Sequence, residues 1–273
     1  MSRKISNTEK YEFEIGKEGL NYDILDSSYN PTTQAFALKS GLKSGMKILD
    51  IGCGAGVMTA WLAKQAGPDG LVTAIDNSPE QLAVTQERIR RENIKNVQTK
   101  VLSAYEIDTL NTKYDLIYSR FLLHHLHSPR KAIQAYYDSL AEGGKYIGEE
   151  GIMSLAFAYP PTFAWQGYSP ELKQPEEEQE GQGRDGDIGM KLFYACKRAG
   201  FSILDCGIIQ PVLWKKEQKI MLLEGLKAFK KTDLEQGTTE QEWQNKWDET
   251  QRFSEDENQI IGFYGSFQIA AIK

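Results

Sequence analysis

The chain has few cysteines, no excess of positive charge and no paired metal-ligand motif. Its 273 residues include three cysteines, Cys53, Cys196 and Cys206, which form no CxxC pair. This usage fits a reducing compartment better than a disulfide framework. The formal net charge of -6 argues against a polyanion as the main partner, because nucleic-acid binders usually carry a basic face.

Long apolar segments are also missing. No stretch approaches the roughly 20 apolar residues that a membrane-spanning helix needs, and the first 16 residues are polar, unlike a signal peptide. We therefore expect a soluble, cytoplasmic protein with no membrane partner. With 40% hydrophobic and 26% charged residues, the composition is that of a globular protein long enough to bury a core.

Short strand-like runs alternate with helical segments between about residues 46 and 150. The runs are rich in β-branched or aromatic residues and read MKILDI, LVTAID, VQTKVL, YDLIYS and KYIGEE. Ser78 with Gln81 marks the start of one intervening helix, and Gly143 with Gly144 should end another. This rhythm predicts parallel strands with right-handed crossovers, and so a doubly wound open sheet.

The remaining chain is organised differently. We expect a helix that starts at Asn30 and Pro31, a helix over 187–198 and a strand over 201–213. Two amphipathic stretches near 215–231 and 239–253 then precede a last strand at the end of the chain.

A glycine-rich loop follows the first strand-like run. The sequence ILDIGCGAG places Gly52, Gly54 and Gly56 directly after a run that contains Asp50. Glycine is costly in backbone entropy, so three together suggest that a ligand approaches the main chain. A phosphate-binding P-loop needs a Lys-Ser/Thr pair that is absent here, and a dinucleotide loop needs glycine where Val57 stands. The alternative is a tight turn that binds nothing.

Asp76 supplies a second indication of a ligand. It ends the run LVTAID, 76 − 56 = 20 positions beyond Gly56. A carboxylate at the tip of the second strand can accept hydrogen bonds from both hydroxyls of a ribose, and it would repel a 2′-phosphate. Taken alone, a turn or helix-capping role is an equal alternative for this residue.

Five segments in order carry a resemblance to a known family. ILDIGCGAG, AIDNSPE, LSAYE, YDLIYSRFLLHHL and AEGGKYIGEE resemble class I S-adenosylmethionine-dependent methyltransferases of the small-molecule type, similar to methyltransferase domains 11 and 25. The likeness covers roughly residues 30–150 and extends more weakly to about residue 213. It implies an α/β fold with a Rossmann-like, doubly wound, mostly parallel seven-stranded sheet, helices on both faces and an inserted lid.

The same resemblance implies a division of the chain and an activity. We expect an N-terminal helical cap (1–45), a cofactor-binding core (46–150), a substrate lid (151–186) and a C-terminal part that completes the sheet (187–273). The implied enzyme, EC 2.1.1.-, moves a methyl group from S-adenosyl-L-methionine to a small molecule by in-line displacement, leaves S-adenosyl-L-homocysteine and needs no metal. The alternative is a non-catalytic or regulatory protein that binds the same cofactor.

The resemblance also implies roles for individual positions. The three glycines would let the main chain approach the methionine and ribose portions, Asp50 would help to hold the ammonium group, and Asp76 would bind the ribose diol. The full set of implied cofactor-binding residues is Asp50, Gly52, Cys53, Gly54, Gly56, Asp76, Asn77, Ser103, Ala104, Ser119, Arg120 and Tyr22. Asn77 would flank the adenine, and Ser103 and Ala104 would reach its edge. Many relatives carry Asp where this chain has Ser103, so a side-chain contact to the adenine amino group is weaker here, and the main chain of Ala104 is expected to substitute for it.

All three histidines lie in the run HHLH. In phosphoethanolamine-type methyltransferases a histidine at the position of His125 lies near the transferred methyl, which makes His125 the candidate catalytic residue. A structural, half-buried histidine is the alternative. Phe121 stands where those enzymes have an acidic residue, which counts against a phosphobase substrate. His124 and His127 could share a helical face as metal ligands, but no carboxylate or Cys joins them at ligand spacing.

Substrate choice is expected to lie in the aromatic lid and in the N-terminal segment. Tyr159, Phe163, Trp165 and Tyr168 could form an aromatic cage for the acceptor, or they could be core residues of the lid. A nucleic-acid base methyltransferase would carry an NPPY-like tetrapeptide after the fourth strand, where this chain has YSRF. We therefore expect no nucleic-acid substrate. Oligomeric state and the identity of the acceptor atom cannot be read from these patterns.

Overall fold

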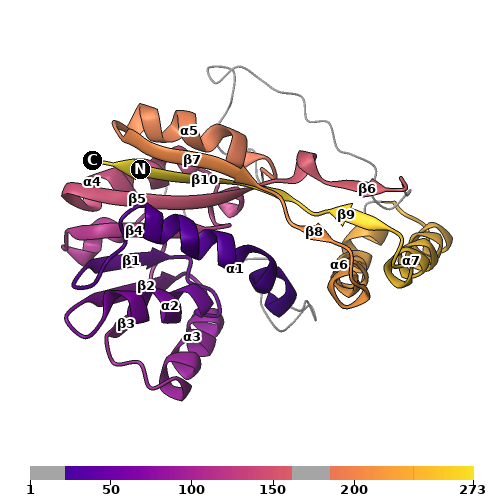
Figure 1. Cartoon of the computed structure of the whole chain (residues 1–273), viewed down its shortest axis with the longest axis horizontal. Coiled ribbons are helices and arrows are strands. Elements are labelled where there is room, and N and C mark those ends of the chain that lie inside the picture. Colours follow the sequence, from indigo (N-terminus) through magenta and orange to yellow (C-terminus); the bar gives the residue numbers. More distant parts are fainter. Residues whose placement is uncertain (1–21, 162–184, 236) are drawn as a thin grey trace, which may run out of the picture.

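The computed structural model describes residues 22–161, 185–235 and 237–273, and the statements below concern these residues (Figure 1). The helices are α1 (Tyr22–Lys39), α2 (Val57–Ala66), α3 (Pro79–Arg91), α4 (Pro129–Ser139), α5 (Ile188–Ala199), α6 (Lys216–Glu235) and α7 (Glu240–Glu255), with short 3₁₀ turns η1 (Ile107–Leu110), η2 (Leu123–His125) and η3 (Met153–Leu155). The strands are β1 (Lys47–Ile51), β2 (Leu71–Asp76), β3 (Val97–Val101), β4 (Tyr114–Arg120), β5 (Leu140–Ile152), β6 (Phe157–Tyr159), β7 (Ser202–Ile209), β8 (Val212–Leu213), β9 (Ile260–Gly262) and β10 (Gly265–Ile272).

The main sheet has seven strands in the order β3-β2-β1-β4-β5-β10-β7. The first five run parallel, and β10 lies antiparallel to both β5 and β7. This confirms the predicted mostly parallel, seven-stranded α/β fold. The strand order reverses between β1 and β4, so their carboxyl ends flank the crevice where open sheets of this kind bind ligands.

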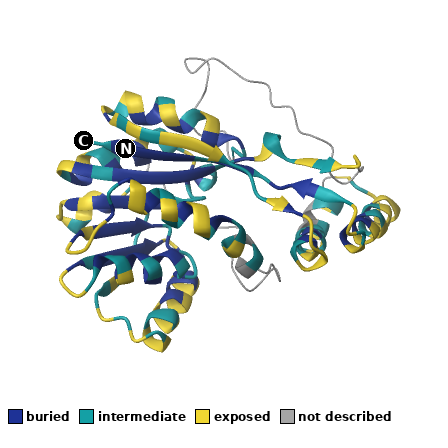
Figure 2. Ribbon diagram, in the orientation of Figure 1, coloured by how far each residue is buried: buried dark blue, intermediate teal, exposed yellow. Residues whose placement is uncertain are grey.

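Helices cover both faces of the sheet. In β1, Leu49 packs toward α4 and α5, whereas its neighbour Ile48 packs toward α1 and α2. Strands buried on both faces read as nearly continuous apolar runs, which is why KILDI and LVTAID contain so few polar residues. Figure 2 shows these strands as the buried centre and the helices exposing their outer surfaces.

Helix α1 begins earlier than predicted. It starts at Tyr22 and contains Pro31 in its interior, so Asn30 is not its cap. The amide oxygen of Asn30 instead accepts a hydrogen bond from Arg120 at 2.7 Å, and the Tyr29 hydroxyl donates to the carbonyl of Tyr264 at 2.6 Å. These tertiary contacts offset the lost main-chain hydrogen bond and the strain that proline imposes on a helix.

Two other predicted boundaries are wrong. Helix α4 ends at Ser139, and Gly143 and Gly144 lie within β5, where they form an irregular stretch with a register shift against β4. The strand predicted over 201–213 is divided into β7 and β8 at Pro211, because proline lacks the N–H that a continuous ladder requires.

A second, three-stranded sheet, β6-β9-β8, lies beyond the carboxyl edge of the main sheet and was not predicted. Figure 1 shows it at the right, with α6 and α7 beside it. The fully buried Lys219 of α6 joins this region, since its Nζ donates to the carbonyls of Phe253 at 3.1 Å, Gln259 at 3.0 Å and Asp256. These bonds satisfy acceptors around the carboxyl end of α7 that have no partner within the helix.

The four-part division of the chain stays a prediction. Helix α1 lies in the expected cap segment, and β7 and β10 add to the sheet from the expected C-terminal part. Within the described ranges, none of the helices combines the length and apolarity that crossing a membrane requires.

Candidate functional site

The glycine loop lies between β1 and α2 in a left-handed conformation. Gly52, Gly54 and Gly56 have φ angles of +70°, +53° and +73°. A residue with a Cβ rarely adopts this conformation. The loop therefore turns sharply at the carboxyl end of β1, and Gly56 is the N-cap residue of α2.

Two of these glycines also make room for side chains of the protein itself. A Cβ at Gly52 would lie 2.9 Å from Cδ1 of Leu122, and one at Gly56 would lie 2.7 Å from Oγ1 of Thr85. Close internal packing therefore requires glycine here, in addition to any ligand. The contact with Leu122 joins the glycine loop to the segment that follows β4.

Asp76 anchors the loop from the end of β2. Its Oδ2 accepts a hydrogen bond from the main-chain N–H of Gly54 at 3.0 Å, and its Oδ1 accepts one from Ser78 at 2.9 Å. Burial raises the pKa of this carboxyl group, and the main-chain N–H bonds oppose that shift. Each carboxylate oxygen can accept a second hydrogen bond, so this pair of acceptor oxygens fits a ribose diol.

Asp50 lies under the loop and is 2% exposed. Its Oδ2 accepts a hydrogen bond from the Thr59 hydroxyl at 2.6 Å, which ties α2 to β1. Burial raises the pKa of Asp50 to about 6, although Thr59 and the Arg120 charge act in the opposite direction. Asp50 thus joins β1 to the helix that follows the loop, while its roles in orienting the loop and in contacting an ammonium group stay predictions.

The end of β4 is tied to two different layers. Ser119 is fully buried, and its hydroxyl lies 2.9 Å from the hydroxyl of Tyr146, so its predicted contact with a cofactor stays a prediction. Arg120 donates to Asp26 of α1 at 2.6 Å and to Asn30 at 2.7 Å. Arg120 therefore holds α1 over the carboxyl edge of the sheet.

The positions expected around the adenine lie together after β2 and β3. Asn77 is exposed, and Ala104 is buried in the core. The Ser103 hydroxyl accepts a hydrogen bond from the N–H of Tyr105 at 3.3 Å. Cys53 is buried in the glycine loop beside Thr85, and burial raises the pKa of its thiol. Their contacts with a cofactor stay predictions.

The comparison with protein families concerns this same region. Residues 48–144 match the model of the family described as Methyltransferase domain. These residues include the glycine loop, Asp76, Arg120 and the histidine turn. Over residues 48–144 the chain is therefore similar to methyltransferase domains.

Curated relatives match parts of the chain at moderate identity. Demethylmenaquinone methyltransferase of Lactobacillus johnsonii is 28% identical over 156 residues, which cover 54% of this chain and 62% of the relative. Phosphoethanolamine N-methyltransferase 1 of Zea mays is 30% identical over 122 residues, 42% of this chain and 23% of the relative. The chain covers 28%, 45% and 62% of the lengths of the first three curated relatives.

A solved structure shows the fold over most of the chain. The [4+2]-cyclase SpnF has a TM-score of 0.59 at 18% identity, with 90% of this chain and 82% of that chain covered. At this level of identity the likeness concerns the fold alone.

The histidine turn η2 of the methyltransferase domain follows β4 directly. Nδ1 of His124 lies 3.4 Å from Oε2 of the fully buried Glu150, and the rings of His124 and His125 are 3.7 Å apart between centroids. His127 is exposed. Within the described ranges no group of three or more His, Cys, Asp or Glu could hold a metal ion.

Of the four predicted aromatic-cage residues, the described part of the chain contains Tyr159. Tyr159 lies in β6 and is 68% exposed. The other three cage candidates, Phe163, Trp165 and Tyr168, lie outside the described residues. Tyr22 is the first residue of α1. The roles of these residues stay predictions.

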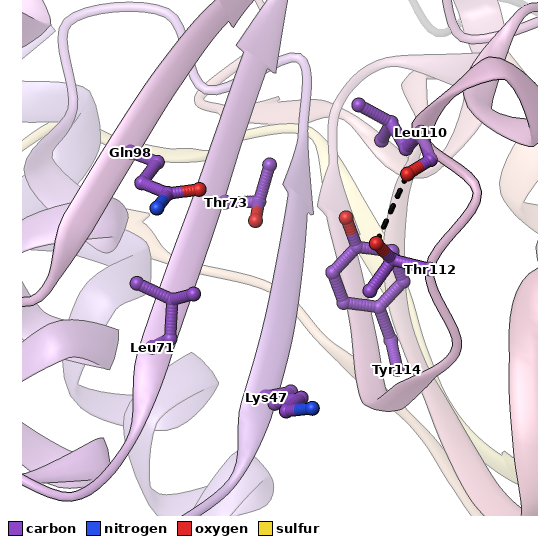
Figure 3. A pocket seen from close by; sticks show the side chains of 7 residues that line it. All are labelled: Lys47, Leu71, Thr73, Gln98, Leu110, Thr112 and Tyr114. Carbon is purple, nitrogen blue, oxygen red and sulfur yellow. Dashed lines mark hydrogen bonds between the residues drawn. The ribbon is translucent and has the colours of Figure 1, made fainter.

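A shallow pocket elsewhere on the domain is not this site. Figure 3 shows its lining residues, Lys47, Leu71, Thr73, Gln98, Leu110, Thr112 and Tyr114. Lys47, Leu71 and Tyr114 are the first residues of β1, β2 and β4. The pocket therefore lies at the amino ends of the strands, opposite the glycine loop.

The paired acids Glu149 and Glu150 of β5 were not predicted as functional residues. Oε1 of Glu149 accepts a hydrogen bond from Ser266 at 2.6 Å, and Oε2 accepts one from Thr33 of α1. Both glutamates are at most 1% exposed. Their signal was present in KYIGEE, because two acids inside an otherwise strand-like run are costly to bury unless they have partners.

Proposed function

We propose that this chain transfers a methyl group from S-adenosylmethionine to a small-molecule acceptor. The observation that carries the proposal is the contact between the glycine loop and Asp76, in which Gly54 N–H binds one carboxylate oxygen at 3.0 Å. This contact lies at the reversal of strand order, within the matched methyltransferase domain. The acceptor oxygens of Asp76 suit a nucleoside with a free diol.

The residues around the glycine loop would have separate roles in binding. Asp76 would bind the ribose diol, Ser103 and Ala104 would lie at the adenine edge, and Asp50 would support the loop beneath the amino-acid arm. The cofactor supplies a methyl group on a positively charged sulfur. The protein's contribution is to hold the acceptor in line with that methyl group at about 3 Å, a geometry that can supply much of the rate.

A small acceptor is favoured by charge and by the relatives. The net charge of -6 disfavours nucleic acid. Related names include a demethylmenaquinone methyltransferase and a phosphoethanolamine N-methyltransferase, and a coclaurine N-methyltransferase of similar fold was solved with N-methylheliamine and SAH. These names point to small acceptors of different chemistry, so they support the class of substrate but no single compound.

Isothermal titration with S-adenosylmethionine and S-adenosylhomocysteine tests the proposal. We expect binding by the wild-type chain and weaker binding by Asp76→Ala. Asp76→Asn is a second variant that retains an acceptor oxygen for the loop. Asp69→Asn, an exposed aspartate in the turn before β2, is the matched control and should bind normally. No binding by the wild type would refute the proposal.

The alternative is a protein that binds the cofactor without methyl transfer. One solved structure of similar fold is named as a [4+2]-cyclase and not as a methyltransferase. The fold alone therefore does not determine that a methyl group is transferred. The two functions differ in product. Tight cofactor binding without a methylated product, across a panel of phenols, amines and carboxylates, would favour the alternative.

A further inference from the structure

Glu150 organises the segment that carries the histidines. Its Oε1 accepts two main-chain hydrogen bonds, from Leu122 at 3.0 Å and from Leu123 at 2.8 Å. The side chain is fully buried. One carboxylate oxygen therefore fixes the main chain where β4 passes into η2.

The other oxygen of the same carboxylate faces His124. Oε2 of Glu150 lies 3.4 Å from Nδ1 of His124. An ionised carboxylate can only accept hydrogen bonds, so in the neutral imidazole the proton lies on Nδ1 and Nε2 has the free lone pair. The His124 side chain is 26% exposed, so its ring is not fully enclosed.

This pair lies next to the proposed cofactor loop. Leu122, two residues before His124, packs directly against Gly52 of the glycine loop. The ring of His125 packs against that of His124 with an interplanar angle of 43°. The two histidines thus lie on the segment that contacts the loop, and His124 is the one that the buried carboxylate holds.

We infer that His124, held by Glu150, accepts a proton from the methyl acceptor. The inference rests on the proposed function and narrows its substrate class to acceptors with an O–H or N–H group. The acceptor's lone pair forms a bond to the methyl carbon, the carbon–sulfur bond breaks with its electron pair left on sulfur, and the proton passes to Nε2 of His124. Glu150 is the positioning residue, and its negative charge balances the resulting imidazolium.

Glu150→Gln separates this role from a structural one. The N–H groups of Leu122 and Leu123 require an acceptor, so the amide oxygen of the glutamine should replace Oε1. Its NH₂ group then faces Nδ1 of His124 and donates to it. The loop should keep its structure, but the proton of the imidazole should move to Nε2, which removes the lone pair that accepts the proton.

Two-dimensional NMR of protein with ¹⁵N-labelled histidine reads this tautomer directly. The chain has three histidines, and His→Gln variants assign their signals. We expect His124 to be protonated on Nδ1 in the wild type and on Nε2 in Glu150→Gln. A wild-type ring protonated on Nε2 when neutral, or a folded Glu150→Gln protein with an unchanged tautomer, would overturn the inference.

Turnover supplies the second test. The probes are phenols and primary amines in one arm, and a tertiary amine and a thioether in the other. His124→Gln should lower turnover of the first class by about 100-fold without weakening S-adenosylmethionine binding, whereas the exposed His127→Gln is the control and should not. Unchanged turnover in His124→Gln, or methylation confined to the tertiary amine and thioether, would refute the role of His124. If the wild type does not bind S-adenosylmethionine at all, the proposed function is refuted instead.

Discussion

Replacing Gly52 by alanine should destabilise the chain through two separable effects. At a φ of +70°, a residue with a Cβ is strained by about 1–2 kcal/mol. The new methyl group would also meet Leu122, whose Cδ1, Cδ2 and Cγ would lie 2.9, 3.2 and 3.3 Å away. Forcing a methyl group into a packed contact costs about 1–3 kcal/mol. The total loss in the free energy of unfolding should be about 2–5 kcal/mol.

Gly143→Ala is the matched control. Gly143 also has a φ of +70°, but no heavy atom lies within 4 Å of its Cβ position, so only the strain of about 1–2 kcal/mol should remain. Urea unfolding followed by the fluorescence of the five tryptophans measures both variants. Combining Gly52→Ala with Leu122→Ala should recover the steric part as a positive coupling. Equal losses for the two glycine variants, with no coupling, would refute the packing argument.

Three further variants test the buried polar groups. The pKa of Asp50 is raised from 3.8 to about 6 in the folded state, so the wild type loses stability as pH rises through this window. Asp50→Asn lacks this loss, and its free energy of unfolding should therefore gain about 3 kcal/mol relative to the wild type between pH 4 and 7. Urea unfolding at a series of pH values measures this, and a constant difference between the two proteins across that range would contradict it. Arg120→Gln removes the charged contact with Asp26, which should cost about 3 kcal/mol and speed hydrogen exchange in α1. The exposed Arg90→Gln is the control and should leave the urea midpoint unchanged. Lys219→Met removes the ammonium group that binds three carbonyls, so the free energy of unfolding should fall by about 2–4 kcal/mol and the urea midpoint should fall with it. An unchanged midpoint would show that water replaces the ammonium group.

The glycine loop was readable from the sequence because its signals are local. Positive φ angles at Gly52, Gly54 and Gly56 follow from the residue type, and Asp76 ends a strand whose apolar pattern is plain. A short loop between a strand and a helix has few possible geometries. Its neighbours in sequence are therefore also its neighbours in space.

The contacts that surround the ends of β4 and β5 were not readable in the same way. The bond between Arg120 and Asp26 joins residues 94 positions apart, and Glu149 and Ser266 are 117 positions apart. Nothing local indicates that such residues meet. The contact with Asn30 also explains why α1 continues through Pro31, against its local preference.

The glycine loop could therefore be predicted from neighbouring residues, whereas the contacts around the ends of β4 and β5 could not. Local sequence pattern is sufficient to predict the α/β fold and the glycine loop. The pattern consists of the glycines, the apolar strands and the carboxylate of Asp76. The tertiary structure alone decides that Glu150 binds the segment after β4 and faces His124, because two parallel strands separated by a crossover meet only when the sheet forms. A buried carboxylate must find its partners across such contacts, and those partners distinguish His124 from its two neighbours.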